Sequence, residues 1–152
     1  AVHRLENKKY DLDFVREIIE QAAIVYDSEK SAILELGGGV PKNTAQQTGP
    51  LLDQILRRND GGQDYIIQIT DARPDTGGLS GATLQEGKSW GKIHDSHEGM
   101  ITVYADATIA FPILALYVLS NQKTRKPKRI YKKIGKLYDK LSEDYFKNPS
   151  NS

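Results

Sequence analysis

Three short apolar runs, separated by longer segments of helical periodicity, limit the possible folds of this chain more than any other feature. The runs are Ser31 to Leu36, Tyr65 to Ile69 and Ile101 to Tyr104. Strands that alternate with helices along a chain are typical of a parallel sheet in an α/β domain. Two of the three runs are apolar enough to predict strands that are buried on both faces.

Helices are predicted before, between and after these strands. The fourth of them is apolar on nearly all sides, so we expect it to be central and buried. A sheet of three strands is too small to cover such a helix. We therefore predict a partial Rossmann-like parallel sheet with flanking helices, completed by a missing N-terminal segment or a partner chain. Apolar spacing places the helices at residues 13–26, 43–58 (interrupted by Gly49 and Pro50), 82–90 (with Ser80 as its cap), 106–120 (opened by Asp106 or Thr108) and 127–146.

The composition of the 152 residues fits one domain and excludes several classes of protein. Cysteine is absent, which excludes disulfides, cysteine-ligated zinc, iron–sulfur clusters and cysteine nucleophiles. We see no apolar run of membrane-spanning length and no secretion leader. We therefore expect a cytoplasmic protein that does not associate with a membrane.

Charge divides the chain into two parts. Residues 1–120 carry 11 Lys and Arg against 17 Asp and Glu, whereas residues 121–152 carry 10 against 3. We therefore assign residues 1–120 to the α/β domain and 121–152 to a basic amphipathic C-terminal helix. The apolar stripe of that helix favours packing on the body or on a neighbouring subunit over binding to nucleic acid.

A triple glycine, Gly37, Gly38 and Gly39, follows the first strand directly. Glycines at the carboxyl end of a strand let the backbone approach a ligand closely. The spacing differs from the G-x-G-x-x-G dinucleotide fingerprint, and Pro41 stands where a helix should begin. A tight turn between strand and helix is an equal alternative to a ligand site.

The long loop at residues 70–81 leads to Ser89-Trp90-Gly91-Lys92-Ile93, which holds the strongest candidate for a reactive side chain. Lys92 lies in a locally apolar context beside the only tryptophan. A lysine that is desolvated against an indole ring has a lowered pKa and can act as an amine nucleophile that forms a Schiff base. The alternative is a lysine whose stem crosses Trp90 while its amine stays in water.

Two further constellations have simpler explanations. Asp106, between the third strand and the apolar helix, can cap that helix or can meet a ribose hydroxyl or an amine. His94 and His97 have the spacing of a metal pair, but no other ligand lies nearby in the sequence. We expect a solvated loop there and no metal site.

Four motifs together resemble the C-terminal part of the deoxyhypusine synthase family, the part that bears the catalytic lysine, and most closely its bacterial-type and archaeal-type members. The resemblance covers residues 13–120 and leaves the basic tail outside. The motifs are, in order, Gly37-Gly38-Gly39-Val40-Pro41-Lys42, Gly77-Gly78-Leu79-Ser80-Gly81-Ala82, Ser89-Trp90-Gly91-Lys92-Ile93 and Val103-Tyr104-Ala105-Asp106-Ala107.

The resemblance implies an NAD-dependent transferase that moves the aminobutyl group of the polyamine spermidine. Hydride transfer to NAD yields an imine, whose butylimine part passes to an enzyme lysine and then to a lysine of a translation initiation factor, where it is reduced. The enzyme lysine corresponds to Lys92. Trp90 would stack along the butyl chain, and Glu86 would meet a cationic amine of the substrate.

Further binding roles follow only from the resemblance. Some positions match the substrate side of the family site and others match the NAD side. The substrate-side positions, besides Glu86 and Trp90, are Asn43, Gly77, Gly78 and Leu79, and the cofactor-side positions are Gly37, Gly38, Gly39, Asp71, Ala72, Asp106 and Ala107.

Two residues and the chain length depart from typical members. Asn43 replaces a histidine that helps with proton transfer, and Leu79 replaces an aspartate that faces a terminal amine of spermidine. Both changes resemble relatives that make homospermidine or use other amines, so putrescine is an alternative acceptor and a non-catalytic regulatory subunit is an alternative role. Family members are tetramers of more than twice this length, so we expect an N-terminal chain or segment and a homo- or hetero-tetramer.

Overall fold

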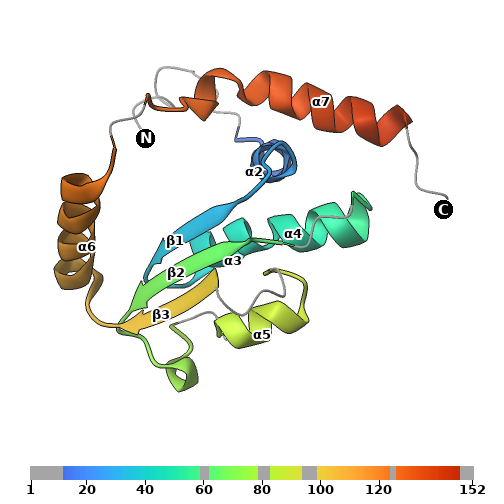
Figure 1. Ribbon diagram of the computed structural model, residues 1–152. Coiled ribbons are helices and arrows are strands. Elements are labelled where there is room, and N and C mark those ends of the chain that lie inside the picture. The colour runs from blue at the N-terminus through green and yellow to red at the C-terminus, as the bar shows by residue number, and fades with distance from the viewer. Residues whose placement is uncertain (1–11, 59–61, 79–82, 94–98, 124–125, 148–152) are drawn as a thin grey trace, which may run out of the picture.

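The computed structural model describes residues 12–58, 62–78, 83–93, 99–123 and 126–147 and contains the expected parallel sheet. Strands β1 (Ala32–Leu36), β2 (Tyr65–Thr70) and β3 (Met100–Tyr104) lie side by side in the order β1-β2-β3 (Figure 1). Both pairings are parallel, with Ile67 of β2 opposite Leu34 on one side and Ile101 on the other. The predicted α/β class is therefore confirmed.

One face of the sheet is covered by α3 (Val40–Gln46) and α5 (Leu84–Ser89). The Gln46 amide donates a hydrogen bond to the Glu35 carboxylate of β1, which ties α3 to this face. Side chains of α5 and of the turn after it enclose Ile66 of β2 in a small apolar core. In Figure 1, α3 lies behind the strands. This covered face is the one that carries the candidate site.

The opposite face of the sheet is open in the described part of the chain. It carries Leu34 and Leu36 from β1 and Ile101 and Val103 from β3, all of them exposed. The prediction that two strands are buried on both faces is therefore wrong for β1 and β3 in this chain by itself, whereas Ile69 of β2 is 2% exposed on this face. Alternating residues of a strand point to opposite faces, and only one face has helices packed on it. A bare apolar face is typical of one layer of a larger α/β unit.

Helix α6 (Ala107–Asn121) begins where expected but is not buried. Asp106 caps its N-terminus, yet Ile113, Leu116 and Leu119 are each 67% exposed. The helix stands at the carboxyl end of the strands, away from the other helices (Figure 1). The predicted burial is wrong for this chain by itself, because a helix that is apolar all round needs partners on several sides, and in the described part of the chain only β2 contacts it extensively.

The helical segment after the glycine turn begins earlier than predicted, and its geometry changes around the predicted interruption at Gly49 and Pro50. α3 begins at Val40, and Pro41 lies in the first turn, where its missing N–H would have had no partner. The segment continues through α4 (Thr48–Pro50) into a π-helical turn, η1 (Leu51–Ile55). A proline that follows a strand-ending glycine turn thus starts a helix here and does not prevent one.

The loop after β2 contains a 3₁₀ turn, η2 (Pro74–Thr76), and leads to α5. α5 begins two residues later than predicted. Its N-cap is Thr83 and not Ser80, which lies outside the described residues. The Thr83 hydroxyl accepts a hydrogen bond from the Glu86 N–H, and the Glu86 carboxylate accepts one from the Thr83 N–H. Such a reciprocal capping box fixes a helix start strongly.

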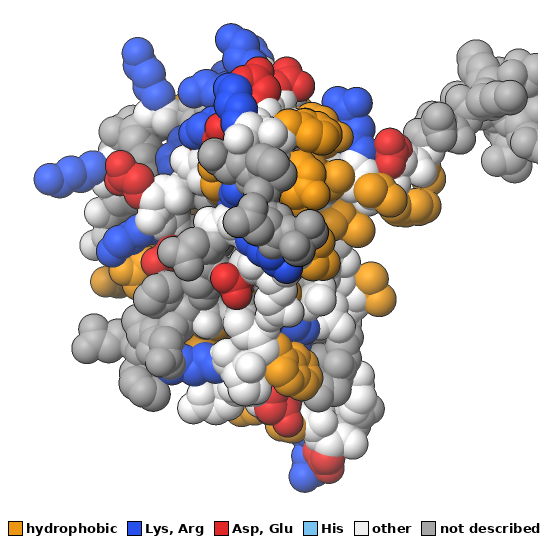
Figure 2. Space-filling view, turned by 90° about the vertical axis from the view of Figure 1, so that its right-hand side faces the viewer, with side chains coloured by type: hydrophobic (Ala, Val, Ile, Leu, Met, Phe, Trp, Pro, Cys, Tyr) orange, Lys and Arg blue, Asp and Glu red, His pale blue; other side chains and the backbone are white. Residues whose placement is uncertain are grey.

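The basic tail packs on the body of the same chain. Its helix α7 (Ile134–Lys147), preceded by a 3₁₀ turn η4 (Ile130–Lys132), lies against α2 (Phe14–Tyr26), with Leu141 buried between them. Tyr26 donates a hydrogen bond to the Asp144 carboxylate at 2.9 Å. Lysine and arginine side chains gather at the top of the view, where α7 runs (Figure 2). Packing on the body is therefore confirmed as the role of the apolar stripe.

No helix in the described ranges combines the length and the apolar composition that a membrane crossing requires.

Candidate active site

The backbone around Lys92 is held by close packing against the segment that precedes β2. The Lys92 N–H donates to the carbonyl of Gly87, and the Lys92 carbonyl accepts from the Gln63 N–H at 3.2 Å. Gly62 approaches so closely that a Cβ there would lie 2.6 Å from the Lys92 carbonyl carbon. Gly62 also has φ of +86°, a conformation that favours glycine. These contacts fix the point from which the Lys92 side chain extends.

The Lys92 side chain is buried, although its neighbour Trp90 is half exposed. Lys92 is 7% exposed, and its Nζ donates a hydrogen bond to Asn43 Oδ1 at 3.2 Å. The Nζ also lies 4.9 Å from the centre of the Trp90 ring. Burial lowers the pKa of the Lys92 ammonium. The structure thus disagrees with the alternative in which the amine stays in water, and an amine in this setting can act as a nucleophile.

Two hollows meet at Lys92, so the buried amine remains within reach of a ligand. One has a volume of about 460 Å³ and lies between Trp90, Pro50 and Gln54. The other, of about 430 Å³, is lined by Asn43, Val40 and Ile18 of α2. Gln47 lines both hollows together with Lys92. The structure therefore brings together Lys92, Trp90 and Asn43, which the sequence predicts for one site.

A buried polar cluster next to this site is not predicted from the sequence. Lys42 of α3 is 4% exposed and Glu35 of β1 is 5% exposed. The Glu35 Oε1 accepts from Gln46 at 2.6 Å, while no described group forms a hydrogen bond with its Oε2. Burial raises the pKa of the Glu35 carboxyl, which Gln46 and Lys42 oppose. The sequence signal that could have predicted this cluster is the Glu35 carboxylate inside the apolar run of β1.

The other predicted substrate-side residues lie away from the Lys92 amine or outside the described ranges. The Glu86 carboxylate is exposed and engaged in the capping box of α5, and its charge reaches Lys42. Gly77, with φ of +75°, and Gly78 lie in the exposed loop after η2. Leu79 lies outside the described residues. The structure leaves the binding roles of these residues as predictions.

The predicted cofactor-side residues gather at the carboxyl edge of the sheet. The glycine turn follows β1, Asp71 and Ala72 follow β2, and Asp106 and Ala107 follow β3. In open α/β sheets, nucleotide ligands bind at this edge. The residues at the edge are Gly37, Gly38, Gly39, Asp71, Ala72, Asp106 and Ala107.

Contacts at this edge show which groups are already occupied. The Gly37 carbonyl accepts a hydrogen bond from Gln68, and the space where a Gly37 Cβ would project is empty. Asp106 accepts from the Thr108 N–H and hydroxyl, and these bonds lower the pKa of the Asp106 carboxyl. Asp106 therefore does cap α6, as the simpler explanation predicts. Open backbone at the glycine turn and the exposed Asp71 carboxylate fit a nucleotide with ribose hydroxyls.

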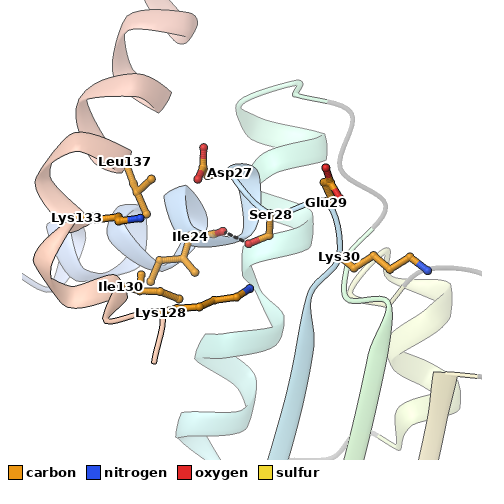
Figure 3. Close-up of a pocket in the computed structure, with 9 residues that line it drawn as sticks. All are labelled: Ile24, Asp27, Ser28, Glu29, Lys30, Lys128, Ile130, Lys133 and Leu137. Carbon is orange, nitrogen blue, oxygen red and sulfur yellow. Dashed lines mark hydrogen bonds between the residues drawn. The ribbon is translucent and has the colours of Figure 1, made fainter. Parts of the chain in front are cut away.

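A separate hollow of about 720 Å³ lies between the end of α2 and the tail (Figure 3). Its lining combines an apolar floor with Lys128, Lys133 and Glu29, and it contains none of the predicted site residues. Asp27 at its rim is bound to Lys140 at 2.7 Å. Both carboxylates and ammonium groups line this hollow, so its lining does not select one class of ligand.

In the described ranges no group of three His, Asp or Glu side chains converges. His94 and His97 lie outside the described residues.

An open parallel sheet whose carboxyl edge is lined by glycine backbone, with a buried lysine beside it, defines an α/β protein with a candidate amine nucleophile. A family model for deoxyhypusine synthase matches residues 1–118. The chain is 48% identical to a deoxyhypusine synthase-like protein of Nostoc punctiforme over 95% of this chain and 38% of that protein. It is 40% identical to a probable deoxyhypusine synthase 2 of Archaeoglobus fulgidus, over 81% of this chain and 41% of that protein. The chain belongs to the deoxyhypusine synthase family.

The matches differ in how much of the basic tail they cover, and they cover only part of each relative. The match to the Nostoc punctiforme protein covers 95% of the chain and so includes most of the basic tail. The family model ends at residue 118 and does not reach the tail. The chain spans about two fifths of the length of the curated relatives that it matches. Most of each relative therefore has no counterpart in this sequence.

Proposed function

We propose that this chain supplies the lysine-bearing part of an NAD-dependent aminobutyl transferase. The observation that carries the proposal is the buried Lys92 amine, bound to Asn43 and facing the Trp90 ring. Membership in a transferase family that is generally NAD-dependent supports it. The donor would be spermidine, and the acceptor would be a lysine of a translation initiation factor.

Lys92 would act as the nucleophile. Its uncharged amine adds to the imine carbon of the oxidised donor, the bond from that carbon to the departing nitrogen breaks, and diaminopropane leaves with the electron pair and a proton. The butylimine is then held on Lys92 until the acceptor amine displaces it in the same way. Desolvation favours the uncharged amine that this step needs.

Trp90 and Asn43 would prepare Lys92 for this reaction. The Trp90 ring, which lines the larger hollow with Pro50, offers an apolar surface along which a butyl chain can lie. Asn43 orients the Lys92 amine through its amide oxygen and carries no charge that would favour the ammonium. Glu86, Gly77, Gly78 and Leu79 are proposed to contact the polyamine.

The carboxyl edge of the sheet would hold NAD, through the glycine turn and through the carboxylates of Asp71 and Asp106. NAD, when bound, supplies removal of a hydride from the donor and its later return. Lys42 and Glu35 line a hollow with Gly37 and Gly38 of the glycine turn.

We further propose that the rest of the enzyme covers the open sheet face and α6. The chain spans only about two fifths of its relatives, and both surfaces are apolar and exposed here. The assembly would be a homo- or hetero-tetramer, as the resemblance implies. Its polyamine partner would reach Lys92 through the two hollows.

The test is a covalent trap on the complete assembly. The protein is incubated with NAD and spermidine and reduced with borohydride, and Lys92 is examined by peptide mass spectrometry. We expect a butylamine adduct on Lys92 that disappears without NAD and in Lys92→Ala. Absence of the adduct, or turnover unaffected by Lys92→Ala, contradicts the proposal. Supplying the translation factor or putrescine as acceptor then separates protein modification from homospermidine synthesis, and a chain that only activates a partner gives no adduct.

A further inference from the structure

Gln68 of β2 is a buried polar residue for which the sequence predicts no role. It is 1% exposed and pairs in register with Glu35 of β1, so its side chain lies on the face of the sheet that α3 covers. The Gln68 Nε2 donates a hydrogen bond to the Gly37 carbonyl at 3.1 Å. A buried side-chain amide needs such a partner, because an unsatisfied one costs free energy. Gln68 finds its partner in the glycine turn.

The backbone of Gly37 is therefore held by β2 at two points. The Gly37 N–H donates to the Ile69 carbonyl at 2.7 Å, and the Gly37 carbonyl accepts from Gln68. The first bond continues the backbone ladder between β1 and β2. The second bond depends on a side chain and acts where the chain leaves the strand. Gln68 thereby orients the peptide unit that joins Gly37 to Gly38.

The orientation of this peptide unit decides what the Gly38 N–H can reach. The described peptide bonds are all trans, and in a trans peptide the carbonyl and the following N–H point in opposite directions. Because Gln68 holds the Gly37 carbonyl toward the covered interior, the Gly38 N–H points outward at the carboxyl edge of the sheet. Among the described residues, no group accepts a hydrogen bond from this N–H.

Two successive glycines leave this peptide unit free to turn over. Gly37 has φ of +91°, and glycine adopts positive and negative φ about equally well. The backbone alone therefore does not select the orientation in which the Gly38 N–H points outward. The hydrogen bond from Gln68 favours that orientation over the reversed one.

We propose that Gln68 is a positioning residue of the NAD site: by holding the Gly37 carbonyl, it aims the Gly38 N–H at an oxygen atom of the nucleotide. Gly38 is one of the predicted cofactor-side residues, whereas Gln68 lies buried beneath the turn and acts only through Gly37. This inference rests on the proposed function, because it names a residue that serves the same NAD site.

The test removes the hydrogen-bond donor and measures NAD binding. Gln68→Met keeps the length of the side chain and leaves the Gly37 carbonyl without this partner. In the complete enzyme without polyamine, isothermal titration calorimetry should show the affinity for NAD reduced by about three- to tenfold, the effect of one lost hydrogen bond. Once NAD is saturating, the borohydride adduct on Lys92 should form at the unaltered rate. Tyr26→Phe, which removes one hydrogen bond between α2 and α7, should leave the affinity for NAD unchanged.

Unchanged affinity for NAD in a folded Gln68→Met variant overturns the inference and leaves the proposed function in place. Weaker binding together with slower adduct formation at saturating NAD would indicate general damage to the site and also overturns it. Where circular dichroism shows that the variant does not fold, hydrogen exchange of the unaltered enzyme supplies the measurement. NAD should slow exchange of the Gly38 N–H more than that of the Gly37 N–H, which is already bonded to Ile69. Equal slowing, or none, overturns the inference.

Failure of the proposed function gives different results. An unaltered enzyme that binds no NAD would reject the proposed function together with the role of Gln68. An unaltered enzyme that binds NAD, loses affinity in Gln68→Met and forms no adduct on Lys92 would support the role of Gln68 and reject only the aminobutyl transfer.

Discussion

Lys92 donates a hydrogen bond to Asn43 across 3.2 Å, and this bond links the first helix after the glycine turn to the segment that follows α5. The two residues are 49 positions apart in the sequence. Because Asn43 is neutral, the bond orients the amine and favours its charged form less than a carboxylate would. The pair therefore meets both needs of a nucleophilic lysine, a fixed direction and a lowered pKa.

A carboxylate in place of the Asn43 amide should impair Lys92. Asn43→Asp puts a negative charge beside the amine, favours the ammonium and raises the pKa of Lys92 by about one unit or more. At neutral pH the rate of adduct formation should then fall by about tenfold for each unit. The rate is measured by borohydride trapping at several pH values. Asn43→Ala, which removes the hydrogen bond without adding charge, serves as the control, and an equal shift in both variants would contradict the electrostatic explanation.

A side chain at Gly62 should destabilise the protein. In Gly62→Ala the new Cβ would meet the Lys92 backbone at 2.6 Å, and the positive φ would be strained. We expect the free energy of unfolding, measured in urea, to fall by about 2 kcal/mol or more. Gly135→Ala, in α7, meets open space and should raise it by about 0.5–1 kcal/mol. Equal effects would show that the close approach at Gly62 is not structurally important.

Glu35 should make stability depend on pH. Its pKa in the folded protein is raised above the ordinary value of 4.5, so its contribution is fully present below pH 4.5 and is lost as the pH rises through the folded-state pKa. In Glu35→Gln that decline should be absent. Urea unfolding of both proteins between pH 4.5 and pH 7.5 measures it, with the exposed Glu29→Gln as a control that keeps the original slope. An unchanged slope in Glu35→Gln would show that Glu35 is ionised throughout.

Leu141 should anchor the tail to the body. It is 1% exposed in the core between α2 and α7, so Leu141→Ala leaves a cavity and should cost about 3 kcal/mol of unfolding free energy. Phe146, on the same helix, is 75% exposed, and Phe146→Ala should cost less than about 0.5 kcal/mol. Thermal or urea denaturation compares the two. Similar losses would mean that α7 is not packed on α2 in solution.

Local patterns predict the elements that depend on local chemistry. The three strands and the helices α2, α5 and α6 lie within two residues of where apolar spacing places them, whereas α7 begins at Ile134, seven residues later than predicted. The start of α3 is missed because Pro41 is read as a barrier, whereas the first turn of a helix accepts proline. Gly49 and Pro50 predict the interruption before the π-helical turn, but they do not predict the change of hydrogen-bond period that follows.

The errors in burial have a different cause. Periodicity shows that α6 and the strands are apolar, but it does not show what covers them, and here Leu116 and Ile101 are exposed. The Lys92 site combines residues that spacing and motif both favour. Lys42 and Glu35 escape notice because only the three-dimensional arrangement shows which face of β1 is covered by α3.

The outer edges of β1 and β3 have a consequence for how this polypeptide can be handled. In the described part of the chain each of these strands pairs only with β2, so each presents a row of backbone N–H and carbonyl groups next to a bare aliphatic surface. Such borders are templates for intermolecular strand addition. We expect the polypeptide to aggregate when it is synthesised alone and to remain dispersed when the proposed remainder of the enzyme is produced with it.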